Sequence, residues 1–522
     1  MLKNLYRNFL LFLISPCRIS LAWIPWTLCI GMFLLNIFRY YPGRVDPDTY
    51  NQYCQMEVGI IGDWHPPIMV ATWQLCRWAY CGLTGETIRG EGFLYVAWTF
   101  LMAGGLLLIL RSHQPFWQNK GEHQKSWWGV GVVVCFLLWL FFEFVGEPLH
   151  IIRKDVGLLA SYLFAVGCLM SLPSKGFARW CVASVALFFF FYGTAIRHNA
   201  IFAVIPLLCW LVCRMIPQRK TAVIVFYTFI LWIAMLATIH VVNYDVIGAV
   251  RLYPLQERFY ADIFHLNARS NCFVLPPNTF GNDFSDLDEK VFREKFKDGR
   301  LNIRGAFHEL NEFYPGKNFT LDRSVDIIVP SPSEDAVRSV PEFYGDHRDI
   351  DYGCNYLMGF VSEELVRKQF PVDYPLLRKA WVNRVLQDPV TYVKFKTDFF
   401  LKYCRGYCLY FLGLNALLLL PLVSLIAVSF LLTKDPFQQP TAPGALLAWS
   451  ALFYLAPLWM FLPEEYAYRY LYWFFAAGII SIASACANSE LIRSLIGSIE
   501  NHWDTKLRDA ARSLQSPLEH NE

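Results

Sequence analysis

Long apolar runs separated by short polar segments dominate this chain. A helix that crosses a bilayer needs about 20 mostly apolar residues, and ten runs approach that length. We therefore expect an all-α polytopic membrane protein with about ten transmembrane helices, the sixth of them short. The runs cover residues 21–38, 93–110, 127–146, 156–172, 180–196, 200–213, 221–241, 407–432, 445–462 and 470–487.

Two of the segments between the runs are long. Residues 39–92 contain a weaker apolar stretch at 68–81, which Arg77 interrupts, and this pattern favours a helix lying in the membrane interface. Residues 243–404 are more polar and long enough for a small, mixed or mostly helical domain. Helical spacing of apolar residues predicts helix within 373–403. We expect an N-terminal transmembrane module at 1–242, with its first outer loop at 39–92, an extracytoplasmic domain at 243–404, C-terminal transmembrane helices at 405–487 and a tail at 488–522.

The distribution of Lys and Arg predicts the orientation. If the N-terminus is cytoplasmic, sixteen Lys and Arg residues fall in inside segments and eight in the outside segments other than 243–404. Short cytoplasmic loops carry such an excess. We therefore expect a multi-pass protein of the inner (plasma) membrane with both termini in the cytoplasm and 243–404 outside.

Composition supports the membrane interpretation and gives no indication of a nucleic-acid partner. The chain is 55% hydrophobic and 17% charged, against about 25% charged in soluble domains. A net charge of +3 does not suggest a nucleic-acid partner. The 15 cysteines show no zinc-ligand spacing. If the outside is oxidising, Cys272 and Cys354 are candidates for a disulfide.

Ionisable residues gather at the predicted outer ends of the apolar runs. Charged groups at membrane depth are costly and mark functional sites, and these all fall on one side of the membrane. Singly, each has a simpler explanation: a snorkelling anchor, a helix cap, a rigid turn or an aromatic-belt residue. Together on one face they favour a single site. They are Asp46, Asp48, Asp63, His65, Arg153, Lys154, Asp155, Arg197, His198, Asn199, Arg469 and Tyr470.

Such a set of residues suits group transfer from a lipid phosphate. Cations beside a membrane can hold a phosphate, and arginine does so with two parallel hydrogen bonds. They also stabilise the charge that develops on a departing phosphate. A nearby carboxylate can take the proton from an attacking hydroxyl.

The first outer loop carries the more specific motif. It reads Pro-Gly-Arg-Val-Asp-Pro-Asp-Thr-Tyr-Asn-Gln over 42–52, followed by Asp-Trp-His-Pro-Pro over 63–67. This loop, with Lys154-Asp155, Arg197-x-Asn199 and Arg469-Tyr470, resembles the polytopic GT-C superfamily of glycosyltransferases, which includes protein O-mannosyltransferases and aminoarabinose transferases. The resemblance covers roughly 20–240 and 405–487 and does not extend across 243–404.

The resemblance implies an inverting glycosyltransferase of bacterial envelope (for example lipopolysaccharide) biogenesis, with a polyprenyl-phosphate sugar as donor and a glycan, lipid or protein as acceptor. The first-loop acid would be the catalytic base. Asp48 fits the family pattern better than Asp46, although both remain candidates. Arg153, Lys154, Arg197 and Arg469 would hold the donor phosphate, while Asp63 and His65 would shape the acceptor side. The Asp46–Asp48 spacing permits a divalent metal without requiring one.

Two other functions remain open. A lipid-linked glycan polymerase or ligase also has about ten spans and one large outer loop, but such proteins generally lack a first-loop acid followed by His-Pro-Pro. A transporter or flippase would place paired broken helices and functional charges near the middle of the membrane. This sequence instead concentrates its charges at one face.

Overall fold

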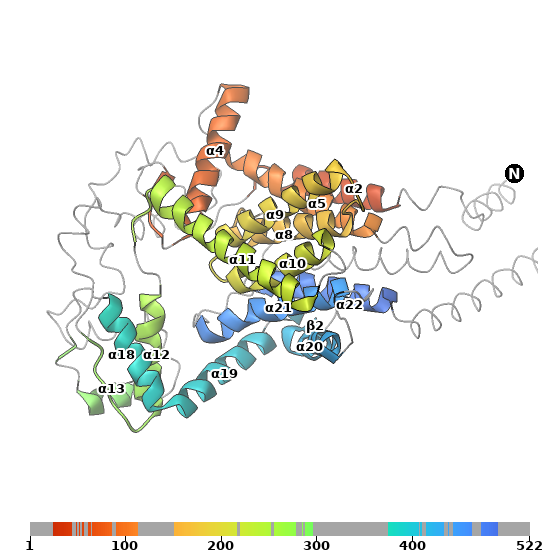
Figure 1. Ribbon diagram of the computed structural model, residues 1–522. Coiled ribbons are helices and arrows are strands. Elements are labelled where there is room, and N and C mark those ends of the chain that lie inside the picture. Colours follow the sequence, from red (N-terminus) through yellow and green to blue (C-terminus); the bar gives the residue numbers. More distant parts are fainter. Residues whose placement is uncertain are drawn as a thin grey trace, which may run out of the picture.

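The computed structural model is a bundle of long apolar helices with a smaller helical domain beyond one end (Figure 1). It describes residues 24–43, 49, 52, 55–56, 61–63, 65–85, 90–112, 151–216, 220–251, 255–277, 284–285, 288–295, 374–406, 408–409, 414–432, 437, 442–461 and 471–488. The bundle contains α2 (Ile24–Tyr40), α5 (Gly90–Ser112), α8 (Lys154–Met170), α9 (Phe177–Ala195), α10 (Ala200–Met215), α11 (Thr221–His240), α20 (Ala416–Leu432), α21 (Ala442–Phe461) and α22 (Tyr472–Asn488).

These helices coincide with apolar runs of the sequence and indicate a membrane protein. Among the described residues, four helices are long and apolar enough to cross a membrane: Gly92–Ser112, Phe177–Ala195, Thr221–Val246 and Ala442–Met460. Cys29–Tyr40, Ala200–Met215, Ala416–Leu432 and Tyr472–Ala485 are apolar but shorter. The number of ten spans stays a prediction, and the run at 127–146 lies outside the described residues.

Helices α5 and α8 approach closely because both carry glycine where they touch. A Cβ atom added to Gly105 would lie 2.7 Å from the Leu163 backbone, and one added to Gly167 would lie 2.7 Å from the Gly105 carbonyl oxygen. Small residues permit this close contact between membrane helices. Almost every side chain of α8 is buried, so this helix forms the centre of the bundle.

Buried polar groups join α8 to the C-terminal helices. The Ser450 hydroxyl donates to the Ala203 carbonyl at 2.6 Å and accepts a hydrogen bond from the Trp473 indole at 2.9 Å. The Trp473 ring meets Tyr162 edge to face, with centroids 4.8 Å apart. These contacts link α8, α10, α21 and α22, which carry the two halves of the transmembrane region.

The end of the bundle that we predict to be cytoplasmic is basic. Arg179, at the start of α9, donates to the carbonyl of Arg214, at the end of α10. Arg214 in turn donates to the Leu172 carbonyl at 3.1 Å. Arg111, at the end of α5, belongs to the same end of the bundle because Ser171 donates to the nearby Leu108 carbonyl at 3.1 Å. The structure therefore gathers residues that the charge pattern assigns to one side.

Helix α4 (Pro67–Thr84) runs across the direction of the bundle helices and projects beyond them (Figure 1). Pro67 occupies its first turn, and Gly85 ends it in the left-handed conformation at φ 75°, which glycine adopts without strain. Leu75, Trp78 and Leu83 are exposed on it. The predicted helix at 68–81 is confirmed, and its exposed apolar residues are typical of a helix in the membrane interface.

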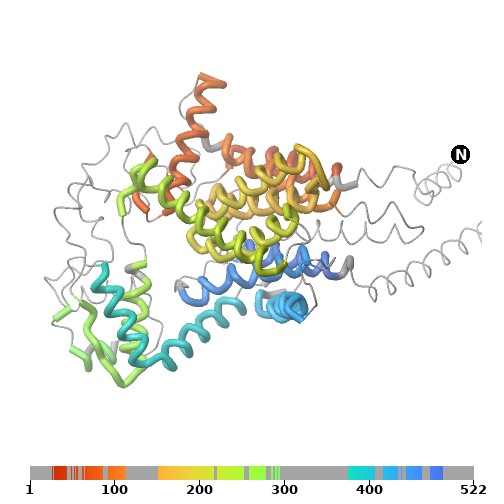
Figure 2. The backbone as a smooth tube through the Cα atoms, in the orientation of Figure 1, coloured from red at the N-terminus to blue at the C-terminus, as the bar shows by residue number. Residues whose placement is uncertain are grey.

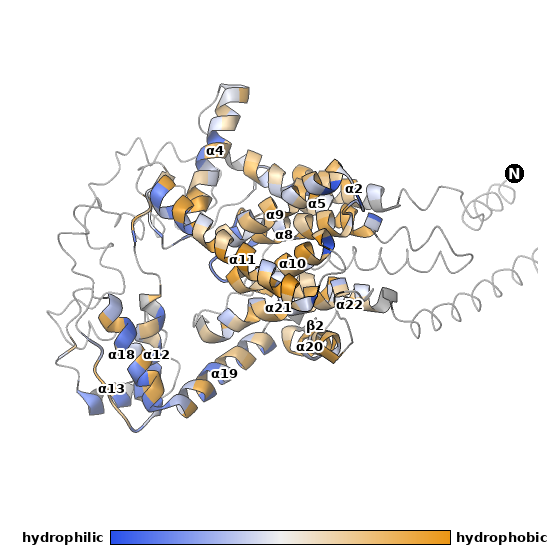
Figure 3. Ribbon diagram, in the orientation of Figure 1, coloured by the Kyte–Doolittle hydropathy of each residue, from blue (hydrophilic) through white to orange (hydrophobic). Residues whose placement is uncertain are grey.

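A helical domain lies at the opposite end from the basic residues and contains more hydrophilic positions than the bundle (Figure 3). Its helices α12 (Gln256–Arg269) and α18 (Tyr374–Gln387) lie side by side although they are far apart in the sequence (Figure 2). Phe259 stacks on Trp381 with ring centroids 4.7 Å apart, and Phe264 packs on Phe292 at 5.5 Å. The domain contains α12 (Gln256–Arg269), α13 (Glu289–Lys295), α18 (Tyr374–Gln387) and α19 (Pro389–Gly406).

The buried carboxylate of Asp262, on α12, contacts side chains from α18 and α19. Asp262 Oδ1 lies 2.6 Å from Lys396 Nζ, and both side chains are almost fully buried. Asp262 Oδ2 accepts hydrogen bonds from the Trp381 indole at 2.9 Å and the Tyr392 hydroxyl at 3.3 Å. Burial and the neighbouring Asp262 carboxylate raise the pKa of Tyr392 above its ordinary value. The network connects α12, α18 and α19.

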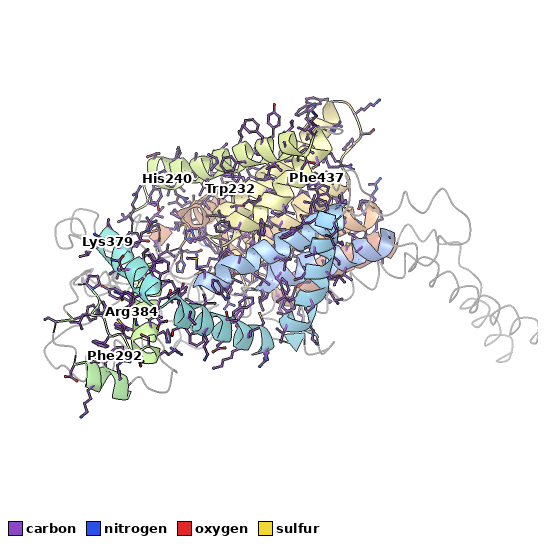
Figure 4. The ribbon with its side chains drawn as sticks, turned by 60° about the horizontal axis from the view of Figure 1, so that its bottom comes forward. Trp232, His240, Phe292, Lys379, Arg384 and Phe437 are labelled. Carbon is purple, nitrogen blue, oxygen red and sulfur yellow. The ribbon has the colours of Figure 1, made fainter. Side chains whose placement is uncertain are left out.

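A second buried charged residue, Arg384, hydrogen-bonds the C-terminal end of α12 and the residues that follow it. Arg384 of α18 (Figure 4) donates to Asn267 Oδ1 at 3.1 Å and to the Cys272 carbonyl at 2.8 Å. A cation is favourable there because carbonyl groups at a helix C-terminus carry partial negative charge. The Cys272 thiol lies 3.8 Å from Gln387 Oε1. Cys354 lies outside the described residues, so a disulfide between these cysteines stays a prediction.

The predicted helical structure within 373–403 is confirmed. It forms two helices, because Pro389 cannot continue a helix and Asp388 Oδ1 accepts a hydrogen bond from the Thr391 N–H at 3.1 Å, starting α19 afresh. The expected span 407–432 begins later, at Ala416. Before it, β1 (Cys408–Leu409) and β2 (Leu414–Asn415) pair antiparallel, which takes these residues out of the helix.

Candidate functional site

The described candidate residues gather at the end of the bundle nearest the helical domain. α8 and α10 begin at this end, and α9 and α11 end there (Figure 1). Described residues of the first outer loop contact the start of α8. The Thr49 hydroxyl donates to the Ile152 carbonyl, and the Gly62 N–H donates to Gln55 Oε1 at 3.0 Å. Thr49 and Gln55 are both buried. The first loop is therefore part of the folded site.

His65 and Lys154 form the direct contact between the first loop and α8. Lys154 Nζ lies 2.8 Å from His65 Nδ1, and the two residues are 8% and 7% exposed. Lys154 is the first residue of α8, and Arg153, also buried, directly precedes it. The helix N-terminus adds partial positive charge at the same place. These groups together create a positive environment that suits an anion.

Asp155 and Arg197 form a buried ion pair. Arg197 Nη2 lies 3.1 Å from Asp155 Oδ1, with side chains 9% and 1% exposed. Arg197 comes from the turn between α9 and α10, and Asp155 from the first turn of α8. The Tyr454 hydroxyl of α21 adjoins this pair and Asn199. The pair therefore holds Arg197 against α8 and connects the site to the C-terminal helices.

Asp63 contacts Tyr244, Val250 and His198 among the described residues. Its carboxylate Oδ2 accepts a hydrogen bond from the Tyr244 hydroxyl at 2.8 Å. Its backbone N–H donates to the Val250 carbonyl at 3.0 Å, and its backbone also hydrogen-bonds the His198 ring. Gly62 and Val250 form a short parallel bridge beside it. Asp63 is thus a junction of the first loop, the α9–α10 turn and the chain that leaves α11.

Tyr244 is a site residue that sequence reasoning missed. It lies in a π-helical turn, η3 (Val241–Val246), that continues α11. Such turns are rare and frequent at functional sites. Its ring lies 4.8 Å from that of His240 and 4.7 Å from the Arg251 guanidinium. The only signal in the sequence was the appearance of Asn243, Tyr244 and Asp245 directly after an apolar run.

His198 lies at the edge of the cationic group. Solvent reaches part of its side chain, yet the surrounding protein atoms desolvate the ring. Desolvation, the charges of Lys154 and Arg197, and the opposing effect of the hydrogen bond to the Asp63 backbone together lower the pKa of His198 to about 4. The lowered pKa favours the neutral form of the ring.

The structure brings together seven of the predicted residues through these contacts: Asp63, His65, Lys154, Asp155, Arg197, His198 and Asn199. Arg153 adjoins them in the chain. Asp46, Asp48, Arg469 and Tyr470 lie outside the described residues, so their roles stay predictions. Among the residues that the structure does describe, no group of three or more His, Cys, Asp or Glu side chains could hold a metal ion.

This arrangement can do two things chemically. Lys154, Arg153 and the start of α8 can attract and hold an anionic group at the membrane end. Asp63 and Asp155 are already engaged by the Tyr244 hydroxyl and the Arg197 guanidinium, respectively. Comparison of the chain with protein-family models, with curated proteins and with solved structures finds no match.

Proposed function

We propose that this protein is a glycosyltransferase that moves a sugar from a polyprenyl-phosphate carrier to an envelope glycan, lipid or protein on the outer face of the membrane. The observation that carries the proposal is the buried group of His65, Lys154, Asp155 and Arg197 at one membrane end of the bundle. Buried cations at the start of a helix suit a lipid-borne phosphate, which reaches that depth by virtue of its hydrocarbon chain.

In the proposed reaction, cations bind the donor phosphate and a carboxylate activates the acceptor hydroxyl. Lys154 and Arg197, with Arg153 and Arg469, hold the donor phosphate and stabilise the negative charge that it gains as the bond to the sugar breaks. Asp48, or alternatively Asp46, takes the proton of the acceptor hydroxyl as that hydroxyl attacks the sugar from the opposite side. A direct displacement of this kind inverts the sugar's anomeric configuration. The helical domain that includes α12 and α18 lies beside this end and is proposed to help select the acceptor.

The charge asymmetry supports an orientation for this reaction. The basic end, with Arg111, Arg179 and Arg214, would face the cytoplasm, and the site and helical domain would face outward. Reporter fusions after Lys220 and within 290–330 test this arrangement. A cytoplasmic signal from 290–330 would contradict it.

The function is tested first in cells and then with purified protein. Mass spectrometry of envelope glycolipids and glycans, with and without the gene, is expected to show a mass difference of one sugar. The purified protein is expected to release polyprenyl phosphate from a polyprenyl-phosphate sugar only when acceptor is present. A loss of whole repeating glycan blocks would instead favour a polymerase or ligase. Unchanged glycans together with altered lipid movement would favour a flippase.

A further inference from the structure

The basic end of the bundle contains two arginines whose guanidinium groups meet at one turn of the chain. Arg179 Nη1 donates to the Ser174 carbonyl at 3.0 Å, and Arg214 Nη2 donates to the Leu172 carbonyl at 3.1 Å. Arg179 also donates to the backbone carbonyl of Arg214. Leu172 and Ser174 belong to the turn between α8 and α9. The two side chains, which come from α9 and α10, therefore converge on that turn.

Within the described part of this end, no carboxylate balances the two charges. Each guanidinium has five N–H donors, and the described residues accept two hydrogen bonds from Arg179 and one from Arg214, all through neutral carbonyl groups. Arg179 is half-buried and Arg214 is exposed, so an external anion can reach them. The chain around the turn is free of Asp and Glu over 106–112, 168–182, 208–216 and 220–226.

Exposed aromatic residues place the two arginines at the level of the membrane surface. Phe177 and Trp180, on either side of Arg179 in the first turn of α9, are 83% and 63% exposed. Tryptophan is enriched where a membrane meets water, and α9 is one of the described helices long and apolar enough to cross a membrane. The anion that a bilayer presents at this depth is a lipid phosphate.

We propose that Arg179 and Arg214 bind the phosphate of an anionic phospholipid in the leaflet at the basic end of the bundle. Arginine matches a phosphate with parallel hydrogen bonds, and basic groups between membrane helices on the cytoplasmic side bind anionic lipid head groups. In the orientation proposed above, the lipid belongs to the cytoplasmic leaflet. The site lies at the opposite end of the bundle from His65 and Lys154 and is independent of the transferase proposal.

The wild-type protein provides the first test. Native mass spectrometry compares binding of dioleoyl-phosphatidylglycerol with binding of dioleoyl-phosphatidylcholine, which has the same chains and a phosphate but no net charge. Phosphatidylglycerol should be preferred, and the preference should weaken as salt is added. Equal binding of the two lipids overturns the proposal. Inorganic phosphate and glycerol phosphate are the probes without chains, and binding of either as tightly as phosphatidylglycerol would assign the site to a soluble anion instead.

A matched pair of substitutions separates a site from general attraction to a charged surface. Arg214→Gln should weaken phosphatidylglycerol binding about ten- to a hundredfold, the effect of losing hydrogen bonds to a charged group. Arg111→Gln removes one charge from the exposed end of α5, at the same end of the bundle. It should weaken binding by no more than about fivefold, the contribution of one basic residue near a membrane surface. Equal weakening by both variants would show diffuse attraction and overturn the proposal.

Thermal unfolding provides a second readout that separates lipid binding from the integrity of the fold. A ligand that binds only the folded state raises the melting temperature, so phosphatidylglycerol should stabilise the wild type more than it stabilises Arg214→Gln. Arg214→Lys keeps the charge but loses the planar fork, and its stabilisation should fall between the two. The melting temperatures in phosphatidylcholine alone measure what each substitution costs the fold. Equal stabilisation of all three proteins by phosphatidylglycerol overturns the proposal.

Discussion

The Tyr244 hydroxyl donates a hydrogen bond to the Asp63 carboxylate at 2.8 Å, although the two residues are 181 positions apart in the sequence. Tyr244 stands in the π-helical turn that ends α11, directly before the chain enters the helical domain. Asp63 stands in the first outer loop, two residues before His65. The contact therefore connects the entry to the helical domain with the loop that faces Lys154.

Tyr244→Phe removes this hydrogen bond and keeps the ring. Because Asp63 is buried, loss of a donor should lower the free energy of unfolding by about 1–3 kcal/mol. Sugar transfer should fall as well, since the first loop loses one of its attachments. Thermal unfolding in detergent and the transfer rate measure the two effects. Tyr227→Phe, on an exposed face of α11, is the matched control, and equal behaviour of the two variants would contradict the role of Tyr244.

The Asp155–Arg197 pair should contribute to both stability and donor use. Arg197→Ala leaves the Asp155 carboxylate buried without its cation, and removal of one partner of a buried pair typically costs about 3–5 kcal/mol. Arg197→Lys keeps the charge but loses the planar fork, so partial activity is expected. Thermal unfolding and donor binding measure the effects, and Arg77→Ala on α4 should leave both nearly unchanged.

A double substitution of Asp155 and Arg197 distinguishes a role of Arg197 in stability from a role in donor binding. Asp155→Asn combined with Arg197→Gln removes both charges, so it should recover part of the stability that Arg197→Ala loses. Donor use should remain low because the cation is still missing. If the double variant recovers donor use along with stability, Arg197 acts only as a structural partner of Asp155.

The helical domain should depend on Asp262. Asp262→Ala leaves Lys396 buried without its carboxylate and removes the acceptor of the Trp381 and Tyr392 hydrogen bonds. The expected loss is about 3–5 kcal/mol, seen as faster proteolysis within 243–404 and earlier thermal unfolding. Asp398→Ala, at an exposed position of α19, is the control. Similar proteolysis of the two variants would show that the buried network contributes little.

The pKa of His198 predicts a pH-dependent contribution to stability. The ring has a pKa of about 4 in the folded protein against 6.5 for an ordinary histidine. A base whose pKa is lowered by folding binds fewer protons in the folded state, so its contribution is fully present above pH 6.5 and is lost as the pH falls toward 4. The melting temperature of the wild type should therefore fall more steeply with acidification than that of His198→Asn over this window. Parallel curves would contradict the assignment.

Local patterns in the sequence predicted the long apolar helices and several of the residues that the structure brings together. Apolar runs identify α5, α9 and α11 because burial in lipid requires apolar side chains over a fixed length. Charged residues next to such runs, such as Lys154 and Arg197, stand out because they are costly there. The break between α18 and α19 was also encoded locally, in Asp388-Pro389, but the apolar spacing on either side concealed it.

Pairing between distant residues could not be predicted in the same way. Nothing local to Asp63 or Tyr244 indicates that they meet, because the contact depends on how the π-helical turn rotates the end of α11 and on the bridge between Gly62 and Val250. The partner of His65 was equally hidden. The sequence pattern therefore indicated which residues gather at one end of the bundle, while the contacts between them required the fold.

The choice of catalytic base is the most direct test of the proposed mechanism. Asp63 and Asp155 were alternatives to the first-loop acids, but Asp63 accepts a hydrogen bond from Tyr244 and Asp155 is paired with Arg197. Both carboxylates are buried and already engaged by these partners. Asp48 and Asp46 therefore remain the candidates.

Asp48→Asn keeps the shape of the side chain and removes its basic oxygen. Transfer should slow by roughly 100- to 10,000-fold, while the protein still inserts and still binds undecaprenyl phosphate, because the phosphate ligands are unchanged. Asp46→Asn should cost less, unless a divalent metal bridges the two carboxylates, in which case both variants should also lose any dependence of the rate on added metal. Turnover is measured with purified variants in detergent, with a polyprenyl-phosphate sugar and its acceptor. Full turnover in Asp48→Asn together with loss in Asp46→Asn would exchange their roles. If both variants retain full turnover, the base lies elsewhere and the resemblance to GT-C glycosyltransferases loses its main support.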